Sequence, residues 1–199
     1  MRIAIAGVGN CASALVQGIE YYRGAADNAV GLMHAEIGGV RPGDLEVVAA
    51  FDVDRRKVGH TLDRAVFAKP NCTTVFCDAV PSSDVRVCMG PVLDGVADHM
   101  ANFADDISFR VADDEPVNVA QVLRDSGAEA LICYLPVGST DAVRFYAQAC
   151  LDGGVAMVNC VPVFIASDPR WAARFRAAGV PLVGDDIKSQ VGATIVHRQ

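Results

Sequence analysis

A glycine-rich turn near the start of the chain is the feature that most constrains its fold. The apolar run Arg2–Ala6 predicts a buried strand, and helical spacing of apolar residues follows from Asn10 onward. The turn between them has the pattern G-x-G-x-x-A, in which the candidate cofactor-binding residues are Gly7, Gly9, Asn10, Cys11 and Ala12. In such a unit the first glycine permits the tight turn, the second lets the backbone approach a pyrophosphate, and the small third residue lets the helix pack on the strand. The pattern predicts a dinucleotide site at a helix N-terminus, with an ordinary glycine turn as the alternative.

Segments of strand and helix character alternate along the rest of the chain. Strands are predicted at 46–51, 73–77, 85–89, 130–135, 155–159 and 182–183, and helices at 10–22, 54–67, 93–103, 116–126, 140–152 and 168–178. Residues 23–44 form a long excursion in which a short helix near Leu32 is one option, and a last helix is expected to open at Asp185. Because the strands are apolar on both sides, the expected fold is α/β, a Rossmann-type doubly wound and mainly parallel sheet with helices on both faces.

Asp52 ends the second predicted strand, where an acid in this fold hydrogen-bonds the adenosine ribose and favours NAD over NADP. It comes 40 residues after Ala12 rather than about 20, a delay that the excursion at 23–44 accounts for. Two alternatives stay open. Asp52 could cap the helix that follows, and Arg55 or Arg56 could accept the 2′-phosphate of NADP.

Polar residues also follow the later strands. Ser139, Asn159 and the pair Asp185 and Asp186 all lie at carboxyl ends of predicted parallel strands, the edge at which open α/β sheets bind ligands. Caps and turns are the alternative for each. Lys188, one of three lysines, could bind phosphate or stabilise an enolate oxygen, or could simply pair with the preceding acids.

Composition excludes several other classes of function. The net charge is −7, the 17 basic residues are scattered, and no apolar run approaches the roughly 20 residues of a membrane span, so neither a nucleic acid nor a membrane is expected as a partner. The seven cysteines have no C-x-x-C pair, and no signal peptide precedes them. We expect reduced thiols, a cytoplasmic protein and no metal site, because no His or Cys has ligand spacing.

Several longer strings resemble the actinobacterial-type inositol-3-phosphate synthases, also called myo-inositol-1-phosphate synthases. The strings are GVGNCAS at 7–13 with QG at 17–18 and EYY at 20–22, AFDVD at 50–54, YLPVGS at 134–139, VPVFIAS at 161–167 and GDDIKSQVGAT at 184–194. They occur in family order over essentially the whole chain, and the last string is highly specific.

The resemblance implies an NAD-dependent isomerase that converts D-glucose 6-phosphate to 1D-myo-inositol 3-phosphate by oxidation, enolisation, intramolecular aldol cyclisation and reduction. It implies a catalytic role for Lys188, which matches a family lysine that binds phosphate and stabilises oxyanions. By the same matching, the glycine turn, Asp52, Ser139, Asp185 and Asp186 fall on the cofactor side. Members of the family are homo-oligomers.

The departure from the family lies in length. Its members carry a second α/β domain, with further catalytic lysines and the tetramer contacts, after the segment that matches 185–194. Residues 1–199 are thus expected to be an incomplete, C-terminally truncated NAD-binding domain, either a fragment or a truncated paralogue, since the segment from Ile187 has no helix stop signal. We expect NAD binding without cyclisation. The alternatives are a non-catalytic NAD-binding module and another NAD(P)-dependent oxidoreductase, which would need a substrate domain and an acid–base pair.

Overall fold

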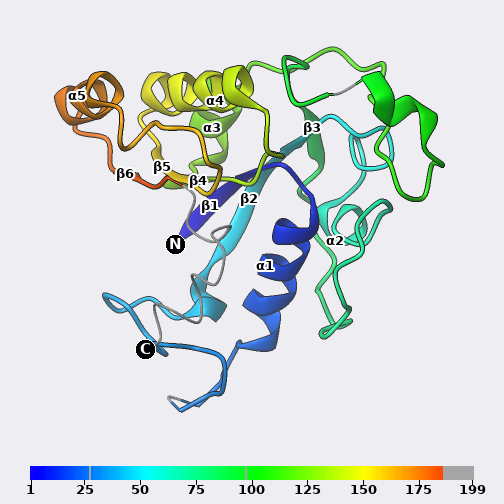
Figure 1. Ribbon diagram of the computed structural model, residues 1–199. Helices are drawn as coiled ribbons and strands as arrows, with labels where there is room; N and C mark the ends of the chain where they lie inside the picture. The colour runs from blue at the N-terminus through cyan, green and yellow to red at the C-terminus, as the bar shows by residue number, and fades with distance from the viewer. Residues whose placement is uncertain (27, 97, 186–199) are drawn as a thin grey trace.

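The computed structural model describes residues 1–26, 28–96 and 98–185, and this part of the chain contains one six-stranded, wholly parallel sheet. The strands are β1 (Arg2–Ala6), β2 (Glu46–Asp52), β3 (Val87–Met89), β4 (Ala130–Cys133), β5 (Ala156–Asn159) and β6 (Leu182–Val183). Their order is β3-β2-β1-β4-β5-β6, so the direction of winding reverses between β1 and β4 (Figure 1). In open α/β sheets this reversal creates a crevice at the carboxyl ends of the strands.

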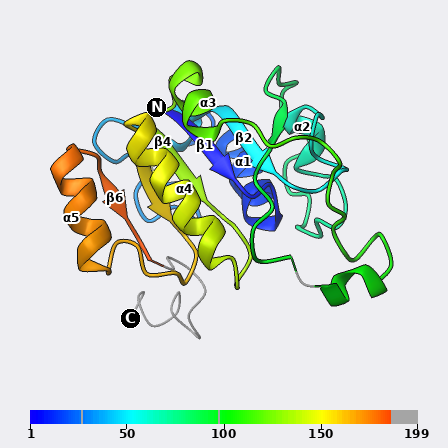
Figure 2. The ribbon, with the colours of Figure 1, turned by 90° about the horizontal axis from the view of Figure 1, so that it is seen from above.

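Helices cover both faces of the sheet. They are α1 (Asn10–Tyr21), α2 (Leu62–Ala65), α3 (Val119–Ser126), α4 (Thr140–Gly153) and α5 (Pro169–Ala178), with 3-10 turns η1 (Pro42–Asp44) and η2 (Asp98–Asn102). One face carries α1 and α2, and the other carries α3, α4 and α5, which lie in front of the sheet in the view from above (Figures 1 and 2). The predicted Rossmann-type doubly wound fold is confirmed.

The side chains of β1 alternate between the two faces of the sheet and contribute to the core on both. Ile5 packs with Val8 and Ala12 beneath α1, whereas Ala4 and Ala6 belong to the cluster under α3 and α4. All five side chains are fully buried. Burying an aliphatic side chain of the size of Ile or Val stabilises the fold by about 1.5–3 kcal/mol, so this short strand anchors the domain as well as positioning the turn that follows it.

Local signals set the helix ends where the sequence predicted them. Asp168 accepts a hydrogen bond from the backbone N–H of Arg170 at 2.8 Å, Pro169 occupies the first helical position, and Gly179 ends α5 at φ 67°. Gly154 ends α4 in the same left-handed conformation, at φ 69°. A glycine adopts this conformation without the steric penalty that a Cβ atom brings.

The predicted helix at 54–67 is wrong except at α2. The start of this segment is hydrogen-bonded to a distant part of the chain. The backbone N–H of Arg55 donates to the carbonyl of Arg110, and the backbone N–H of Ala112 donates to the carbonyl of Val53, both at 2.8 Å. These long-range bonds replace a helical ladder.

Other local predictions also need correction. Of 93–103 only η2 is helical, Leu32 is not in a helix, and 73–77 is not a strand. The last helix, expected to open at Asp185 and Asp186, falls almost wholly outside the described residues.

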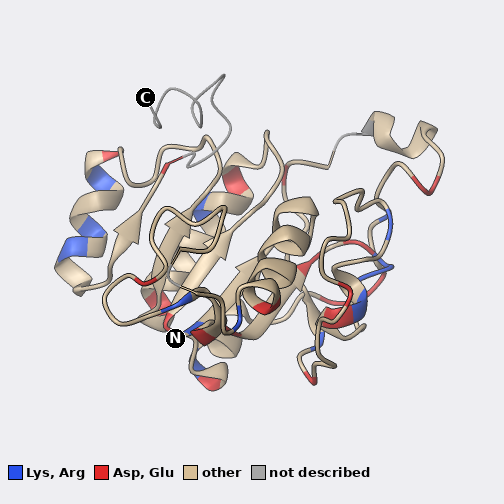
Figure 3. Ribbon diagram, turned by 90° about the horizontal axis from the view of Figure 1, so that it is seen from below, with Lys and Arg blue, Asp and Glu red and all other residues tan. Residues whose placement is uncertain are grey.

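Charged residues are interspersed over the surface of the domain. Figure 3 shows acidic and basic positions interspersed along the ribbon, and the sequence of α5 contains three arginines, Arg170, Arg174 and Arg176. No helix in the described ranges is both long and apolar enough to cross a membrane.

Candidate functional site

A cleft of about 430 Å³ lies at the carboxyl ends of β1, β2 and β4. Six of the predicted cofactor-binding residues line it: Gly7, Gly9, Asn10, Cys11, Asp52 and Ser139. Ala12 lies below the cleft in the core, where it lets α1 approach the sheet. Asp185 does not line the cleft, and Asp186 and Lys188 fall outside the described residues, so the predicted roles of these three stay untested.

The two glycines of the turn serve different purposes. Gly7 has φ 90°, and a Cβ there would come within 2.8 Å of the carbonyl oxygen of Tyr134, so the fold itself requires glycine. Gly9 has φ −90°, and a Cβ there would meet nothing within 4 Å. Its missing side chain is not needed for packing and leaves space in the cleft beside the start of α1.

The N-terminus of α1 faces this cleft with its first backbone N–H groups unsatisfied within the described structure. No described residue accepts the N–H groups of Asn10, Cys11 or Ala12, no cap bond is made, and no acidic side chain lies in the first turn. The other helices of eight residues or more are capped. Side-chain oxygens of Asn118, Asp94 and Asp168 accept first-turn N–H groups of α3, α4 and α5 respectively. Helix α1 therefore offers the exposed donors and partial positive charge that suit a phosphate.

Asp52 ties the end of β2 to the glycine turn. Its Oδ2 accepts the backbone N–H of Val8 at 2.7 Å, and its Oδ1 accepts those of Val53 and Asp54 at 2.7 and 2.8 Å. The carboxylate thus holds the turn in place while lining the cleft. Its predicted contact with a ribose would add to this structural role.

A buried lysine and an asparagine complete the support of the turn, and both were missed in the sequence. Lys57 is 4% exposed; its Nζ lies 3.7 Å from Asp52 Oδ2 and donates to Asn71 Oδ1 at 3.1 Å. Asn71 in turn donates to the carbonyl of Val8 at 3.1 Å. Lys57, Asn71, Val8 and Asp52 form a closed ring beneath the turn, which we call the turn-support ring. The scarcity of lysines and the place of Lys57 five residues after Asp52 were the available signals.

The two arginines that could have accepted a 2′-phosphate are held elsewhere. Arg55 pairs with Asp105 at 2.9 Å, and Arg56 pairs with Asp54 at 2.8 Å. The hydrogen bonds that the Arg56 guanidinium donates to the Asp54 carboxylate raise its pKa. Neither arginine lines the cleft.

At the other end of the cleft, Asp94 fills the N-terminus of α4. Its carboxylate accepts the backbone N–H groups of Asp141 and Ala142 at 2.7 and 2.9 Å. Burial on its own raises the pKa of Asp94, but these hydrogen bonds outweigh it and lower the pKa below its usual value. Ser139 lines the cleft at this helix end, buried and without a side-chain cap bond. Asp94 therefore caps α4, whereas the side chain of Ser139 makes no cap bond.

Asp185 organises the loop after β5. It accepts backbone N–H groups from Ile165, Ala166 and Ser167 at 3.0–3.1 Å and the side-chain amide of Asn159 at 2.8 Å. Burial opposes ionisation, but these donors outweigh it and lower the pKa of Asp185. Asn159 is itself buried and donates to the carbonyl of Val163. In the described structure Asp185, which follows β6, thus holds the loop that follows β5.

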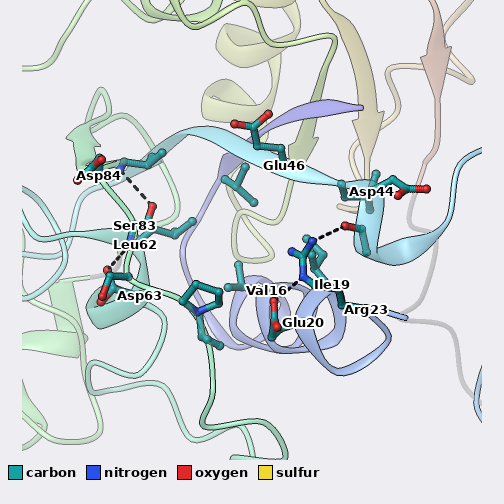
Figure 4. A pocket seen from close by; sticks show the side chains of 17 residues that line it. Val16, Ile19, Glu20, Arg23, Asp44, Glu46, Leu62, Asp63, Ser83 and Asp84 are labelled. Atoms are coloured by element: carbon teal, nitrogen blue, oxygen red, sulfur yellow. Dashed lines mark hydrogen bonds and ion pairs between the residues drawn. The ribbon is translucent and has the colours of Figure 1, made fainter. Parts of the chain in front are cut away.

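A second groove, of about 580 Å³, lies at the opposite edge of the sheet, between the end of α1 and the start of β2 (Figure 4). Val16, Ile19 and Leu62 line it among carboxylates such as Glu20 and Asp63. It contains none of the predicted site residues and faces the amino ends of the strands, so the smaller cleft remains the candidate cofactor site. Within the described part of the chain, no three His, Cys, Asp or Glu side chains gather as a metal site.

Comparison with known proteins relates the chain to one group. It is 56% identical over 200 residues to the inositol-3-phosphate synthase of Mycolicibacterium smegmatis and 54% identical to that of Corynebacterium glutamicum. Each alignment covers 100% of this chain and 53% of the relative. No family model matches the sequence.

Solved structures agree on the fold. The crystal structure of Ari2 superposes with a TM-score of 0.81 at 38% identity, covering 100% of this chain and 56% of that one. A myo-inositol-1-phosphate synthase-related protein from Thermotoga maritima has a TM-score of 0.71 at 21% identity, covering 98% of this chain and 56% of that one, and supports the fold alone. The chain spans about half the length of the curated relatives it matches, and across its whole length it is similar to the inositol-3-phosphate synthases.

Proposed function

We propose that this chain binds NAD in the cleft beside the glycine turn, as the cofactor-binding part of an inositol-3-phosphate synthase. The observation that carries the proposal is the uncapped N-terminus of α1, whose first residues, Asn10 and Cys11, line the cleft with their backbone N–H groups unsatisfied in the described structure. A pyrophosphate is the ligand chemistry that best fits such donors after a G-x-G-x-x-A turn.

NAD is favoured over NADP by the charges around the ribose position. Asp52 lines the cleft at the end of β2, where a carboxylate accepts ribose hydroxyls and repels a 2′-phosphate. Arg55 and Arg56 are engaged by Asp105 and Asp54, away from the cleft. Lys57, a buried lysine nearby, forms an ion pair with Asp52 itself.

The proposed reaction of the whole protein is conversion of D-glucose 6-phosphate to 1D-myo-inositol 3-phosphate. When bound, NAD supplies a reversible hydride acceptor for it. In this chain the glycine turn and α1 would bind the pyrophosphate, and Asp52 and Ser139 would orient the two ends of the cofactor. Lys188 would hold phosphate or a developing oxyanion, and Asp185 and Asp186 would flank the cofactor. We propose that the 199 residues alone bind NAD but do not turn over the sugar phosphate, because the chain matches about half of each relative.

Calorimetric titration of the purified chain with NAD tests the binding proposal. Saturable binding is expected, with NADP at least about tenfold weaker because its 2′-phosphate meets Asp52. Gly9→Val should abolish the NAD signal, since its side chain would enter the space that a pyrophosphate needs. A folded wild-type chain that binds no NAD would refute the proposal.

Turnover is tested separately. Incubation of the chain with NAD and glucose 6-phosphate should release no inositol phosphate after phosphatase treatment. The full-length relative from Mycolicibacterium smegmatis serves as the positive control. Product formation by the chain would overturn the assignment of a cofactor-binding role without catalysis.

A further inference from the structure

The groove between the end of α1 and the start of β2 is separate from the cofactor cleft. Its volume is about 580 Å³, and the two share no lining residue among those that the structure describes. Residues of α1 form one wall, the segment 43–47 forms a second, and α2 with residues 80–85 forms the third (Figure 4). Binding pockets have volumes of about 300–1,000 Å³, so the groove is large enough for a ligand of its own.

The floor of the groove is apolar. Val16 and Ile19 of α1 and Leu62 of α2 line it and are only 8%, 7% and 3% exposed. The partly buried Val80 and Val85 extend this surface. An apolar side chain placed in the groove would therefore pack against residues of the core, where an anchor contributes most to affinity.

The rim of the groove is acidic. Arg23 is the one cation among its described lining residues, and its guanidinium is engaged by Glu20 at 2.8 Å and by the carbonyl of Gly43 at 2.9 Å. Five carboxylates line the same groove, those of Glu20, Asp44, Glu46, Asp63 and Asp84. Figure 4 shows them distributed around the opening rather than on one side of it.

Two of these carboxylates are not engaged by the described structure. Glu46 and Asp84 are exposed, and the carboxylate of neither forms a hydrogen bond or an ion pair with a described residue. Asp63, by contrast, accepts the backbone N–H of Ser83 at 3.3 Å. Glu46 and Asp84 can therefore pair with the cations of an occupant without breaking a contact within the domain.

The charges next to the groove do not neutralise it. A smaller pocket of about 300 Å³ shares Asp63 with it and adds two cations, Arg64 and Arg86. The ammonium of Met1 lies outside the lining residues and donates to the carbonyl of Asp44 at 2.9 Å. The two pockets together hold five carboxylates against three guanidinium groups, so the region stays acidic even when this ammonium is counted.

We infer that this groove docks a basic segment of a partner protein, with a leucine-sized side chain on the floor and lysine or arginine side chains at the rim. Charge complementarity selects this occupant. An acidic segment would face the five carboxylates, and a wholly apolar one would strip water from Glu46 and Asp84 without pairing them. The inference goes beyond the proposed binding of NAD and does not depend on it.

A second copy of this chain is a poorer match to the groove. Among the described helices α5 has the most basic residues, with three arginines, but its Phe175 is 1% exposed and packs in the core of its own domain. That helix can present cations to the rim but cannot insert its phenylalanine into the groove.

Fluorescence anisotropy with a labelled synthetic peptide tests the inference. The probe is a short lysine–leucine peptide whose leucines lie three and four positions apart, and it should bind the chain saturably. Glu46→Gln combined with Asp84→Asn should weaken binding about 5-fold, the loss expected for two exposed ion pairs. Asp113→Asn combined with Asp114→Asn is the matched control, since it removes the same charge at exposed positions outside the groove and should bind like the wild type.

The contribution of the floor is tested on the peptide. A probe with alanine in place of leucine keeps the charge and should bind the wild type at least about tenfold more weakly. This comparison needs no variant of the protein, so it decides the question even if the Glu46 and Asp84 double variant fails to fold. Equal binding of the two probes would exclude the apolar floor and overturn the inference.

Three other results would also overturn it. A folded wild type that does not bind the lysine–leucine probe has no such site. Equal weakening in both double variants would mean a general attraction of cations to an acidic chain. Sedimentation velocity addresses the remaining occupant: wild type and the Glu46 and Asp84 double variant should sediment alike, whereas self-association of the wild type alone would assign the groove to a second copy.

Discussion

Asp52 Oδ2 and the backbone N–H of Val8 are joined by a hydrogen bond of 2.7 Å, so the acid at the end of β2 holds the glycine turn that follows β1. The two strands are neighbours in the sheet, with Ala6 in register with Phe51. The same carboxylate lies 3.7 Å from the buried ammonium of Lys57. Asp52, for which the sequence suggested a ribose contact or a helix cap, therefore also shapes the turn beside which the cofactor would lie.

Removal of the buried positive charge should loosen this arrangement. Lys57→Met leaves the Asp52 carboxylate without its counter-charge and Asn71 without its donor, and breaking a buried pair typically costs about 3–5 kcal/mol. Because Asp52 keeps three backbone donors, we expect the lower end, about 3 kcal/mol, in urea unfolding at pH 7. Lys69→Met, at an exposed lysine, is the control and should change the free energy of unfolding by less than about 0.5 kcal/mol. An unchanged stability of Lys57→Met would show that the turn-support ring contributes nothing.

The two glycines of the turn should separate stability from binding. Gly7→Ala forces a Cβ against the carbonyl of Tyr134 at a positive φ, so the melting temperature should fall by several degrees, corresponding to about 1–3 kcal/mol. Gly9→Ala meets no protein atom and should melt like the wild type, but bind NAD at least about tenfold more weakly. The reverse pattern, with Gly9→Ala unstable and Gly7→Ala tolerated, would contradict the division of roles.

Sheet and outer helices were predictable because their signals are local. The apolar run of β1, the glycine that ends α4 and the Asp168 cap with Pro169 are all legible in a few consecutive residues. The segment at 54–67 was not, because the N–H of Arg55 bonds to the carbonyl of Arg110, 55 positions away. Pairing at that distance leaves no periodic trace in the sequence.

Part of the candidate site could likewise be predicted from the sequence, and part could not. The glycine turn is found from a motif of fixed spacing and Asp52 from its place at the end of an apolar strand, and all of these residues but Ala12 line the cleft. Lys57 and Asn71 have no motif, since they reach the cleft only after the sheet has assembled. Their roles depend on burial, which a single sequence does not express residue by residue.

Acid should weaken the loop after β5 through Asp185. Hydrogen bonds from Asn159 and three backbone N–H groups outweigh burial and lower its pKa in the folded state. A lowered folded pKa means that the stabilisation is fully present above the unfolded value of about 3.9 and is lost as the pH falls through the folded value.

Urea unfolding of Asp185→Asn checks this. The variant should be about 2 kcal/mol less stable than the wild type at pH 7, because an amide cannot accept from so many donors, and the difference should shrink below about pH 4. Asp78→Asn, at an exposed position, should show no such pH-dependent gap. A constant difference between pH 7 and pH 3 would exclude the ionised carboxylate as the source of the stability.

Cysteine reactivity should report occupancy of the cleft. All seven cysteines are free, Cys11 and Cys72 are exposed, and Cys133 and Cys150 are buried. Burial raises the pKa of Cys133 to about 12, so little thiolate forms there at neutral pH. Iodoacetamide at pH 8, followed by peptide mass spectrometry, should therefore modify Cys11 and Cys72 first.

NAD should then distinguish these two thiols. Cys11 lines the cleft beside the N-terminus of α1, so a bound pyrophosphate would cover it, whereas Cys72 lies outside the cleft lining and serves as the control within the same molecule. At a cofactor concentration ten times the dissociation constant, the labelling of Cys11 should slow about tenfold, because only the free fraction reacts. The rate at Cys72 should stay the same. Equal protection of both cysteines would point to a general tightening of the domain, and protection of neither, with binding seen by calorimetry, would place the nucleotide away from the start of α1.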